Sequence, residues 1–483
     1  MTIRSALAYS FGSRYIATAV QLVSTLILAR LLSPEEIGIY SVGASAIMIA
    51  NALRDFGTSN YVIQETELTL PRLRTAFTLT VGIAWSLAIL IFFAATPIGN
   101  FYSEPGVTLV MQVMAINFAL IPLGSIGGAI MKRNMRFQAL MYIAVLSTLV
   151  NSLSAILFAS LGFGFISLAW SAILGTATTV CGNWIAERKA FVMRPSLSER
   201  NRVLAFSLRS SASSIATEAG HAAPDVVLGR TLGMEGTGLF SRALGYVQMF
   251  ERFIQDSLHA VMLPYLAEQV RSGGDIRAKL RDAAPNIAAV TLLVVSLIAT
   301  LAEPAFNVLF GPQWNAAIPA AQLLCAGMAL RCLSPTLSAG MVASGRIANI
   351  MRVSLTATTV KFFLLIVLSP YGLTYAAAGF VGAEALGVSV LLWQCRKANI
   401  FGFLDYAKVI LRVLPPVMAS CATAWLLTTV IPFDNSVGAQ LMRLGVSGSG
   451  AVLLWIVLIW VTDAPPKSEL LRLGAAVMRR RGA

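Results

Sequence analysis

Apolar stretches about as long as a membrane-spanning helix recur from one end of the chain to the other. A helix needs about 20 mostly apolar residues to cross the hydrocarbon core of a bilayer. Fourteen such stretches are separated by short polar connections. They lie near residues 12–32, 37–60, 76–97, 107–131, 138–160, 164–186, 204–229, 237–263, 284–309, 317–343, 350–369, 372–394, 408–431 and 441–462. The pattern predicts an all-α polytopic membrane protein with 14 transmembrane helices.

The connections between these stretches alternate in charge. One set is rich in Arg and Lys, as at 132–136, 188–202 and 271–281, whereas NFYSEPG (100–106) and FGPQWN (310–315) contain neither. Basic connections mark the cytoplasmic side of a membrane protein. We therefore expect a multi-pass protein of the cell inner membrane with both termini cytoplasmic. We interpret the N-terminal stretch as an uncleaved first helix.

The chain also repeats itself. ARLLSPEEIGIYS (29–41) aligns on GRTLGMEGTGLFS (229–241) with five identities in thirteen positions, and LIPLGSIGGAIMKR (120–133) aligns on LSPTLSAGMVASGR (333–346) with five in fourteen. Six predicted helices separate equivalent points, so the two copies have the same orientation in the membrane. This predicts two parallel six-helix repeats plus two C-terminal helices. The expected domains are an N-lobe (1–190), a cytoplasmic linker (191–203), a C-lobe (204–395), the last two helices (396–463) and a basic cytoplasmic tail (464–483).

Three of the prolines inside the predicted spans bear on the helix geometry. Proline lacks the backbone N–H and clashes with the preceding turn, so it breaks or kinks a helix. Pro224 is expected to break or kink the seventh span near its outer half. Pro122 and Pro335 occupy matched positions in the two repeats.

Polar residues form a stripe on the seventh predicted span. Ser211, Ser214, Glu218, His221 and Asp225 follow one another at steps of 3, 4, 3 and 4, which places them on one helix face. The repeat offset of 200 carries the last four onto the first span, where the equivalent residues are Arg14, Thr18, Gln21 and Thr25. Polar residues inside membrane spans are costly and indicate function. The two matched stripes are predicted to line a substrate-binding cavity.

Further charged residues lie within or near the predicted spans. The candidates are Arg54, Arg209, Arg242, Arg252, Arg331 and Lys361. Arginines near span ends also reach to lipid headgroups, and Glu218 or Asp225 can either pair with arginines or serve in ion coupling. His221 and His259 lack partners at metal-ligand spacing, so no metal and no cofactor are expected.

Composition supports the membrane class. The chain of 483 residues is 57% hydrophobic and only 12% charged, about half the charged fraction of a soluble domain. The net charge of +14 is concentrated in the connections, so no nucleic-acid partner is expected. The five cysteines include no C-x-x-C pair and are interpreted as packing residues. A P-loop motif is absent from the sequence.

The segment 26–65 resembles the opening of Wzx-type polysaccharide flippases, which belong to the polysaccharide transporter family of the multidrug/oligosaccharidyl-lipid/polysaccharide exporter superfamily. GPQWNAAIPAAQLL (311–324) is also similar to a loop of that family. The positions that carry the resemblance are Ala29, Arg30, Leu32, Pro34, Glu36, Gly38, Tyr40, Asp55, Gly57, Ile63 and Gln64.

This resemblance implies a flippase that moves an undecaprenyl-pyrophosphate-linked oligosaccharide across the inner membrane by alternating access, for exopolysaccharide or O-antigen biosynthesis. The implied partners are that lipid-linked oligosaccharide, the lipid bilayer and a polysaccharide polymerase or export machinery. Guanidinium groups bind phosphate oxygens bidentately. Arg14, Arg54, Arg209 and Arg252 are therefore the candidate pyrophosphate ligands, and the hydroxyl and amide residues of the stripes are candidates for the sugar.

Three other functions remain open at this point. A lipid II flippase or a cation-coupled multidrug antiporter would share the two-lobe design. A membrane glycosyltransferase or polymerase would need a larger extramembrane loop, and the sequence has no D-x-D motif. The chain is therefore predicted to be a transporter and not an enzyme.

Overall fold

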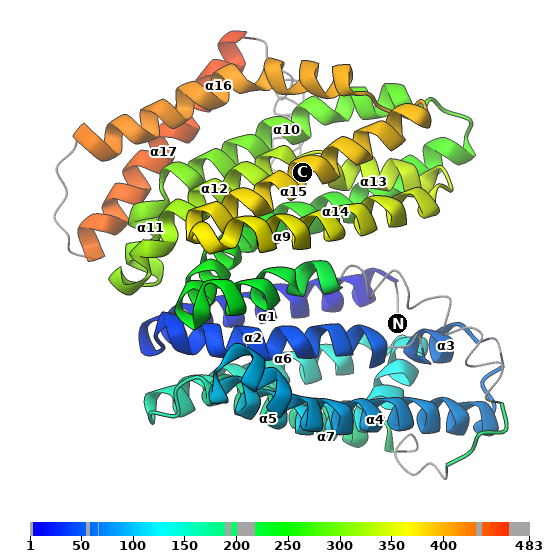
Figure 1. The fold of residues 1–483 in the computed structure, drawn as a ribbon. Helices are drawn as coiled ribbons and strands as arrows, with labels where there is room; N and C mark the ends of the chain where they lie inside the picture. The colour runs from blue at the N-terminus through cyan, green and yellow to red at the C-terminus, as the bar shows by residue number, and fades with distance from the viewer. Residues whose placement is uncertain are drawn as a thin grey trace, which may run out of the picture. The chain divides into compact units, whose positions relative to one another are not determined.

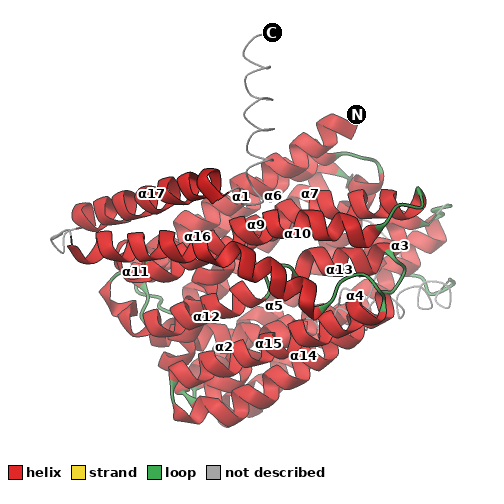
Figure 2. Ribbon diagram, turned by 90° about the horizontal axis from the view of Figure 1, so that it is seen from above, coloured by secondary structure: helices red, strands yellow, loops and turns green. Residues whose placement is uncertain are grey.

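The computed structural model describes residues 3–54, 58–65, 67–188, 195–199, 218–430 and 437–462, and all regular elements in these ranges are helical (Figures 1 and 2). A helical stretch at 218–231 precedes α9. The named elements are α1 (Ile3–Leu31), α2 (Pro34–Arg54), α3 (Thr58–Gln64), α4 (Leu70–Tyr102), α5 (Pro105–Arg133), α6 (Phe137–Ser160), α7 (Ile166–Ala186), α9 (Gly233–Arg271), α10 (Ile276–Thr300), α11 (Ala302–Leu309), η2 (Pro312–Ala317), α12 (Ile318–Leu330), α13 (Ser334–Ala343), α14 (Ile347–Leu368), η3 (Ser369–Tyr371), α15 (Leu373–Lys397), α16 (Phe403–Val430) and α17 (Val437–Thr462).

The chain divides into two compact units, Met1–Gly238 and Leu239–Ala483. The boundary falls inside α9, which continues from the first unit into the second. Most of the expected linker (191–203) lies outside the described residues. The lobe boundaries derived from the repeat remain a prediction.

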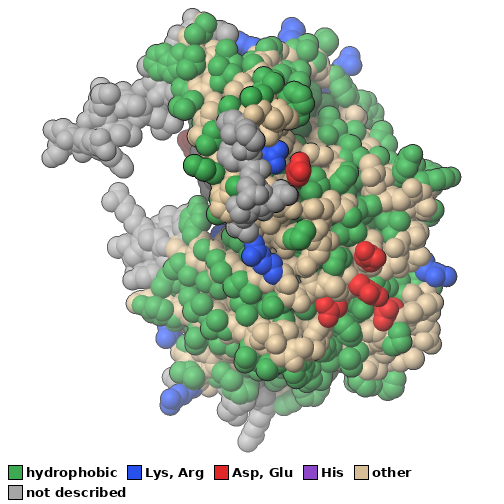
Figure 3. Space-filling view, turned by 90° about the vertical axis from the view of Figure 1, so that its left-hand side faces the viewer, with side chains coloured by type: hydrophobic (Ala, Val, Ile, Leu, Met, Phe, Trp, Pro, Cys, Tyr) green, Lys and Arg blue, Asp and Glu red, His purple; other side chains and the backbone are tan. Residues whose placement is uncertain are grey.

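Ten helices in the described ranges are long and apolar enough to cross a membrane. The side-chain distribution agrees, because large hydrophobic residues such as Phe93, Leu404 and Val461 are 72%, 77% and 75% exposed. In Figure 3 hydrophobic side chains are spread over the whole face in view, and charged side chains are few. Such an apolar exterior is stable in lipid and would be a liability in water. The chain is a multi-pass membrane protein, whereas the count of fourteen spans remains a prediction.

Local sequence signals define several helix starts. The Glu104 carboxylate accepts a hydrogen bond from the Gly106 N–H at 3.0 Å, and Asp275 accepts one from the Arg277 N–H at 2.8 Å. Ser33 and Glu36 form a reciprocal capping box before α2, with N–H to side-chain oxygen distances of 2.8 and 3.2 Å. These side chains satisfy backbone donors that the first helical turn leaves unpaired.

Small residues bring helices of the first unit close together. Asn183 of α7 donates its side-chain N–H to the Gly124 carbonyl of α5 at 2.9 Å, and Trp184 donates to the Leu123 carbonyl at 2.9 Å. A β-carbon on Gly124 would lie 3.0 Å from the Val180 Cα, so glycine allows this spacing. Close approach through glycine with polar side chains bonded across the interface is typical of membrane helices.

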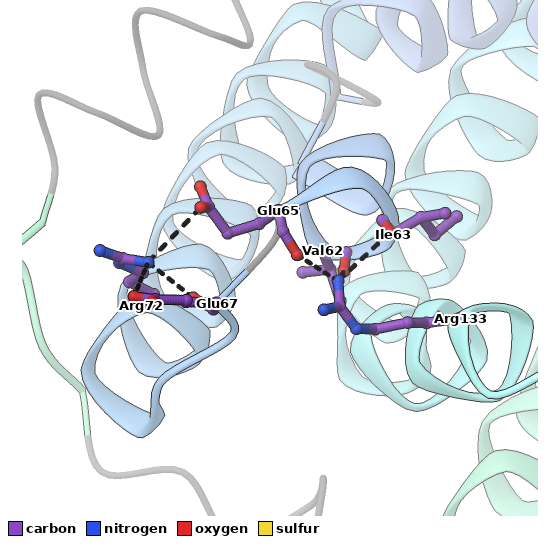
Figure 4. A network of polar contacts seen from close by, with 6 residues as sticks. All are labelled: Val62, Ile63, Glu65, Glu67, Arg72 and Arg133. Carbon is purple, nitrogen blue, oxygen red and sulfur yellow. Dashed lines mark hydrogen bonds and ion pairs between the residues drawn. The ribbon is translucent and has the colours of Figure 1, made fainter.

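An arginine of α5 caps the C-terminus of the short helix α3 (Figure 4). The Arg133 guanidinium donates to the carbonyls of Val62 at 3.0 Å and Ile63 at 3.2 Å, and also to that of Glu65. Beside it, Arg72 pairs with Glu65 at 3.4 Å. The last carbonyls of a helix lack intrahelical partners and carry partial negative charge, which a guanidinium compensates.

In the second unit, α10 packs against α12 and α16, and α17 lies along α16 at the orange and red end of the chain in Figure 1. The hydrophobic core of this unit includes Leu266, Leu280, Leu333 and Phe401, all almost completely buried. These residues come from α9, α10, the α12–α13 break and the segment before α16. The core therefore joins elements that are far apart along the chain.

Two apolar stretches that were expected to be single helices are interrupted. The stretch 284–309 contains the end of α10 and all of α11, and the stretch 317–343 contains α12 and α13. Pro335 lies in the first turn of α13, where a missing N–H costs nothing, and Arg331 lies at the break. By contrast, the helix at 218–231 continues through Pro224, and α5 continues through Pro122, so neither proline breaks its helix.

Candidate functional site

The predicted stripe on the first span lies along one face of α1 that is largely exposed. Arg14, Gln21 and Thr25 are exposed and Thr18 is half-buried, whereas Ser24 and Leu28 are buried. The buried face packs against α6. Because α1 is one continuous helix, the steps of 4, 3 and 4 place the polar residues on the same side. The first unit thus presents an arginine, two hydroxyls and an amide along a helix that is long and apolar enough to cross a membrane.

The matching stripe is described only in its second half. Glu218 and Asp225 are half-buried and His221 is exposed on the helix at 218–231, while Ala222 and Leu228 are buried on its other side. Tyr102 of α4 donates its hydroxyl proton to the Val226 carbonyl at 2.8 Å, which ties this helix to the first unit. Arg209, Ser211 and Ser214 lie outside the described residues.

The two remaining candidate pyrophosphate ligands, Arg54 and Arg252, have different surroundings. Arg54 ends α2, and its guanidinium carbon lies 5.0 Å from the centre of the Phe118 ring. A cation over an aromatic face is stabilised by the ring quadrupole. Arg252 is exposed on α9 and belongs to the second unit.

A buried charge network lies inside the second unit. Arg331, at the break between α12 and α13, forms ion pairs with Glu251 of α9 and with Glu384 of α15, the latter at 3.3 Å. The Lys361 ammonium of α14 lies 3.0 Å from the other Glu384 oxygen and 4.4 Å from the centre of the Phe380 ring. Two acids and two bases thus meet where four helical segments converge.

The network is electrically balanced. The side chains of Glu251, Glu384 and Lys361 are 11%, 10% and 13% exposed, and that of Arg331 is 30% exposed. Ions buried away from water are tolerated only when they are paired and hydrogen-bonded. The pairing therefore fixes α9, α14 and α15 around the α12–α13 break.

Sequence reasoning found only part of this network. Arg331 and Lys361 were candidates because they are basic residues near predicted spans, but Glu384 was missed. Its signal was an acidic residue in the middle of the apolar helix α15, which is a functional or structural hypothesis by itself.

Metal binding has no support in the described ranges. No group of three or more His, Cys, Asp or Glu side chains lies there where it could hold a metal ion. The cysteines Cys325, Cys332 and Cys395 are buried and free, as packing residues would be.

Long apolar helices in two units, with a polar stripe along one helix and a balanced charge network among others, define a polytopic membrane protein of the transporter class. The chain belongs to the family described as Polysaccharide biosynthesis protein, whose sequence profile matches residues 27–319, more than half of the chain. The family assignment made from the sequence is confirmed.

The chain is also similar in sequence to three named proteins. It is 27% identical over 328 residues to the succinoglycan biosynthesis transport protein ExoT of Rhizobium meliloti (strain 1021), a match that covers 67% of this chain and 65% of that protein, so this chain spans just under two thirds of that relative. It is 23% identical to the lipopolysaccharide biosynthesis protein WzxC of Escherichia coli (strain K12), over 86% of this chain and 82% of that protein. It is 22% identical to the teichuronic acid biosynthesis protein TuaB of Bacillus subtilis (strain 168), over 98% of each.

Solved structures confirm the fold. A lipid II flippase, MurJ, in its inward closed conformation matches with a TM-score of 0.73 at 12% identity, over 95% of this chain and 99% of that one. An inward-facing multidrug resistance MATE family transporter matches with a TM-score of 0.64 at 17% identity, over 80% and 95%. The family and these relatives place the protein among transporters and not among enzymes.

Proposed function

We propose that this protein moves an undecaprenyl-pyrophosphate-linked oligosaccharide from the cytoplasmic to the periplasmic leaflet of the inner membrane by alternating access. The proposal is supported by the family membership and by relatives named for succinoglycan transport and lipopolysaccharide biosynthesis. Exopolysaccharide and O-antigen pathways would both supply such a cargo. A polymerase or export machinery is the proposed partner that receives it.

The observation that carries the proposal is the polar stripe of exposed and half-buried residues along α1. A pyrophosphate cannot enter hydrocarbon unpaired, because burying an isolated charge is prohibitively costly. Arg14 provides a guanidinium on this stripe, and Thr18, Gln21 and Thr25 provide groups that exchange hydrogen bonds with sugar hydroxyls. Arg54, Arg209, Ser214, His221 and Arg252 are the further proposed ligands.

The test is the accumulation of lipid-linked sugar in cells that lack the gene. The location of undecaprenyl-pyrophosphate-oligosaccharide is measured by its accessibility from each face of the inner membrane. We expect cytoplasmic-side accumulation that wild type relieves and Arg14→Ala does not. Arg271→Ala is the matched control, because Arg271 is an exposed arginine at the end of α9 that pairs with the neighbouring Glu268. Rescue by Arg14→Ala would remove Arg14 from the site, and absence of accumulation would contradict the proposal.

The same vesicles test the energy source. Glu218 and Asp225, both half-buried, are the proposed ion-coupling groups. If they couple transport to a proton gradient, collapsing that gradient stops transport in wild-type vesicles. Intact transport after collapse would exclude proton coupling and leave the cargo assignment standing.

A further inference from the structure

An arginine of the second unit lies against two aromatic rings. The guanidinium carbon of Arg242 is 5.1 Å from the centre of the Phe310 ring and 4.7 Å from the centre of the Trp314 ring. Arg242 lies near the start of α9, Phe310 follows α11, and Trp314 belongs to η2. All three residues belong to the second unit. Because a cation is attracted to the negative face of an aromatic ring, the two rings hold the guanidinium between α9 and the connection at 310–317.

The two rings are themselves held firmly in place. Trp314 is completely buried, and Phe310 is almost completely buried. The Phe310 ring packs edge-to-face on Phe306 at 5.1 Å and on Tyr246 at 6.4 Å between ring centres. Tyr246 lies one turn further along α9 and donates its hydroxyl proton to the Ile298 carbonyl at 2.9 Å. The guanidinium therefore rests on a packed aromatic cluster that cannot move away without disturbing the core.

The positive charge of Arg242 is not neutralised within the described part of the chain. Arg242 forms no ion pair and no hydrogen bond with any described residue, and its Nε is buried without a hydrogen-bond partner. Arg331 of the same unit, by contrast, pairs with two carboxylates. Ring faces attract a cation but offer no hydrogen-bond acceptor in the plane of the guanidinium. The terminal nitrogens are not enclosed as Nε is, so they remain open to an anion from outside the chain.

The position of this arginine indicates which anion reaches it. Arg242 is half-buried on a long helix, and the connection FGPQWN (310–315) beside it contains no Lys or Arg. The predicted orientation therefore places the site near the periplasmic surface of the membrane. Anionic phosphate groups of lipids lie at that depth. A guanidinium remains ionised when partly buried and binds two phosphate oxygens through parallel hydrogen bonds.

We propose that Arg242, supported by Phe310 and Trp314, forms a binding site for the phosphate group of a membrane lipid at the periplasmic end of the second unit. Arg252, the proposed cargo ligand on the same helix, lies about 15 Å further along the helix axis, so the two arginines form separate sites. A glycerophospholipid and a polyprenyl phosphate both carry the required phosphate. Lipid binding to the purified protein is measured without transport, so the result does not depend on the proposed cargo.

Native mass spectrometry of the full-length protein in detergent measures the binding. Phosphatidylglycerol and undecaprenyl phosphate are titrated separately, and diacylglycerol with the same acyl chains is the lipid without phosphate. We expect at least one phosphate-bearing lipid to bind more tightly than diacylglycerol, and the tighter of the two identifies the source of the phosphate. Arg242→Gln should weaken that binding at least about tenfold, because charge-assisted hydrogen bonds are lost. Equal binding of diacylglycerol and both phosphate-bearing lipids by the wild-type protein would overturn the site.

The control is an arginine with a similar ring contact in the other unit. The guanidinium carbon of Arg230 lies 5.4 Å from the centre of the Phe101 ring, and Arg230 is exposed. Arg230→Gln should leave the affinity for the phosphate-bearing lipid unchanged. An equal loss of affinity in Arg230→Gln and Arg242→Gln would show general attraction of anionic lipid to basic residues, and would overturn the site.

A second variant keeps the positive charge near the rings. Arg242→Lys replaces the planar fork of nitrogens with a single ammonium group, so the contact with the rings remains while bidentate binding is lost. We expect a lipid-free melting temperature close to that of the wild type, together with weaker binding of the phosphate-bearing lipid. Binding by Arg242→Lys as tight as that of the wild type would overturn the role of the guanidinium, even if Arg242→Gln fails to fold.

Discussion

At the scale of single residues, charge inside the membrane is organised by pairing. Glu384 contacts both Arg331 and Lys361, so one carboxylate balances parts of two cations. Burying each of the four charged groups costs desolvation free energy, which the interaction with its partners offsets. The sequence marks such residues as unusual by their position in apolar helices. The identity of their partners depends on the packing of α9, α14 and α15 around the α12–α13 break.

Removing one charged side chain from this network should lower the stability of the protein more than removing two side chains of opposite charge. Glu384→Gln leaves Lys361 and Arg331 without their shared carboxylate, and we expect stability to fall by about 3–5 kcal/mol. Adding Lys361→Met should recover part of the loss because the net charge is balanced again. Thermal unfolding in detergent measures both variants.

The exposed pair Glu268–Arg271 supplies the control for that measurement. Its side chains are 63% and 70% exposed, and Glu268→Gln should change stability by less than about 1 kcal/mol. A Glu384→Gln variant as stable as Glu268→Gln would mean that the buried pairs contribute no net stability.

At the scale of elements, short helices depend on neighbours for their ends. The seven-residue helix α3 is too short to be stable alone, and Arg133 of α5 satisfies the carbonyls at its C-terminus. The basic residues near 132–136 were expected only as markers of the cytoplasmic side. The structure gives one of them this additional capping role.

Replacing this arginine should loosen α3 selectively. Arg133→Met removes charge-assisted hydrogen bonds worth about 1.5–3 kcal/mol in total, so amide exchange in α3 should become at least about tenfold faster. The neighbouring Lys132 is exposed, and Lys132→Met is the matched control. Hydrogen–deuterium exchange of peptides that cover Thr58–Gln64 measures the effect. Equal exchange rates in the two variants would contradict the capping role.

At the scale of the whole molecule, the apolar helices define a multi-pass membrane protein, and the charge of the connections predicts its orientation. Ser103 and Gly372 have backbone φ angles of 56° and 123°. Each lies in a turn between two helices, and neither turn contains a basic residue. Such connections belong on the periplasmic side. The predicted order of fourteen spans therefore assigns a side to every connection.

Reporter fusions check that assignment. Alkaline phosphatase, which is active only outside the cytoplasm, should be active when fused after Ser103 or Gly372 and inactive after Arg136 or Lys397. A fluorescent protein fused to the C-terminus should fluoresce, because the tail is predicted to be cytoplasmic. Phosphatase activity after Lys397 would contradict an even number of spans up to that point.

The sequence by itself determined the properties that depend on residue type and spacing along one chain. Apolar runs identified the membrane class, and the motif around residues 29–41 identified the family. The same information located the α1 stripe, since a helical period of 3.6 residues places Arg14, Thr18, Gln21 and Thr25 on one face.

Only the tertiary structure decided which residues from distant segments meet. The breaks at Leu301 and Arg331, the partners of Glu384 and the contact of Gly38 with Gly238 depend on helices separated by many residues along the chain. The sequence does not distinguish a glycine that faces open space from a glycine that packs against another backbone. Gly82 has no neighbouring atom within 4 Å of an added β-carbon, whereas Gly38 lies against the backbone of Met234. The difference arises from close packing between elements, which local sequence does not encode.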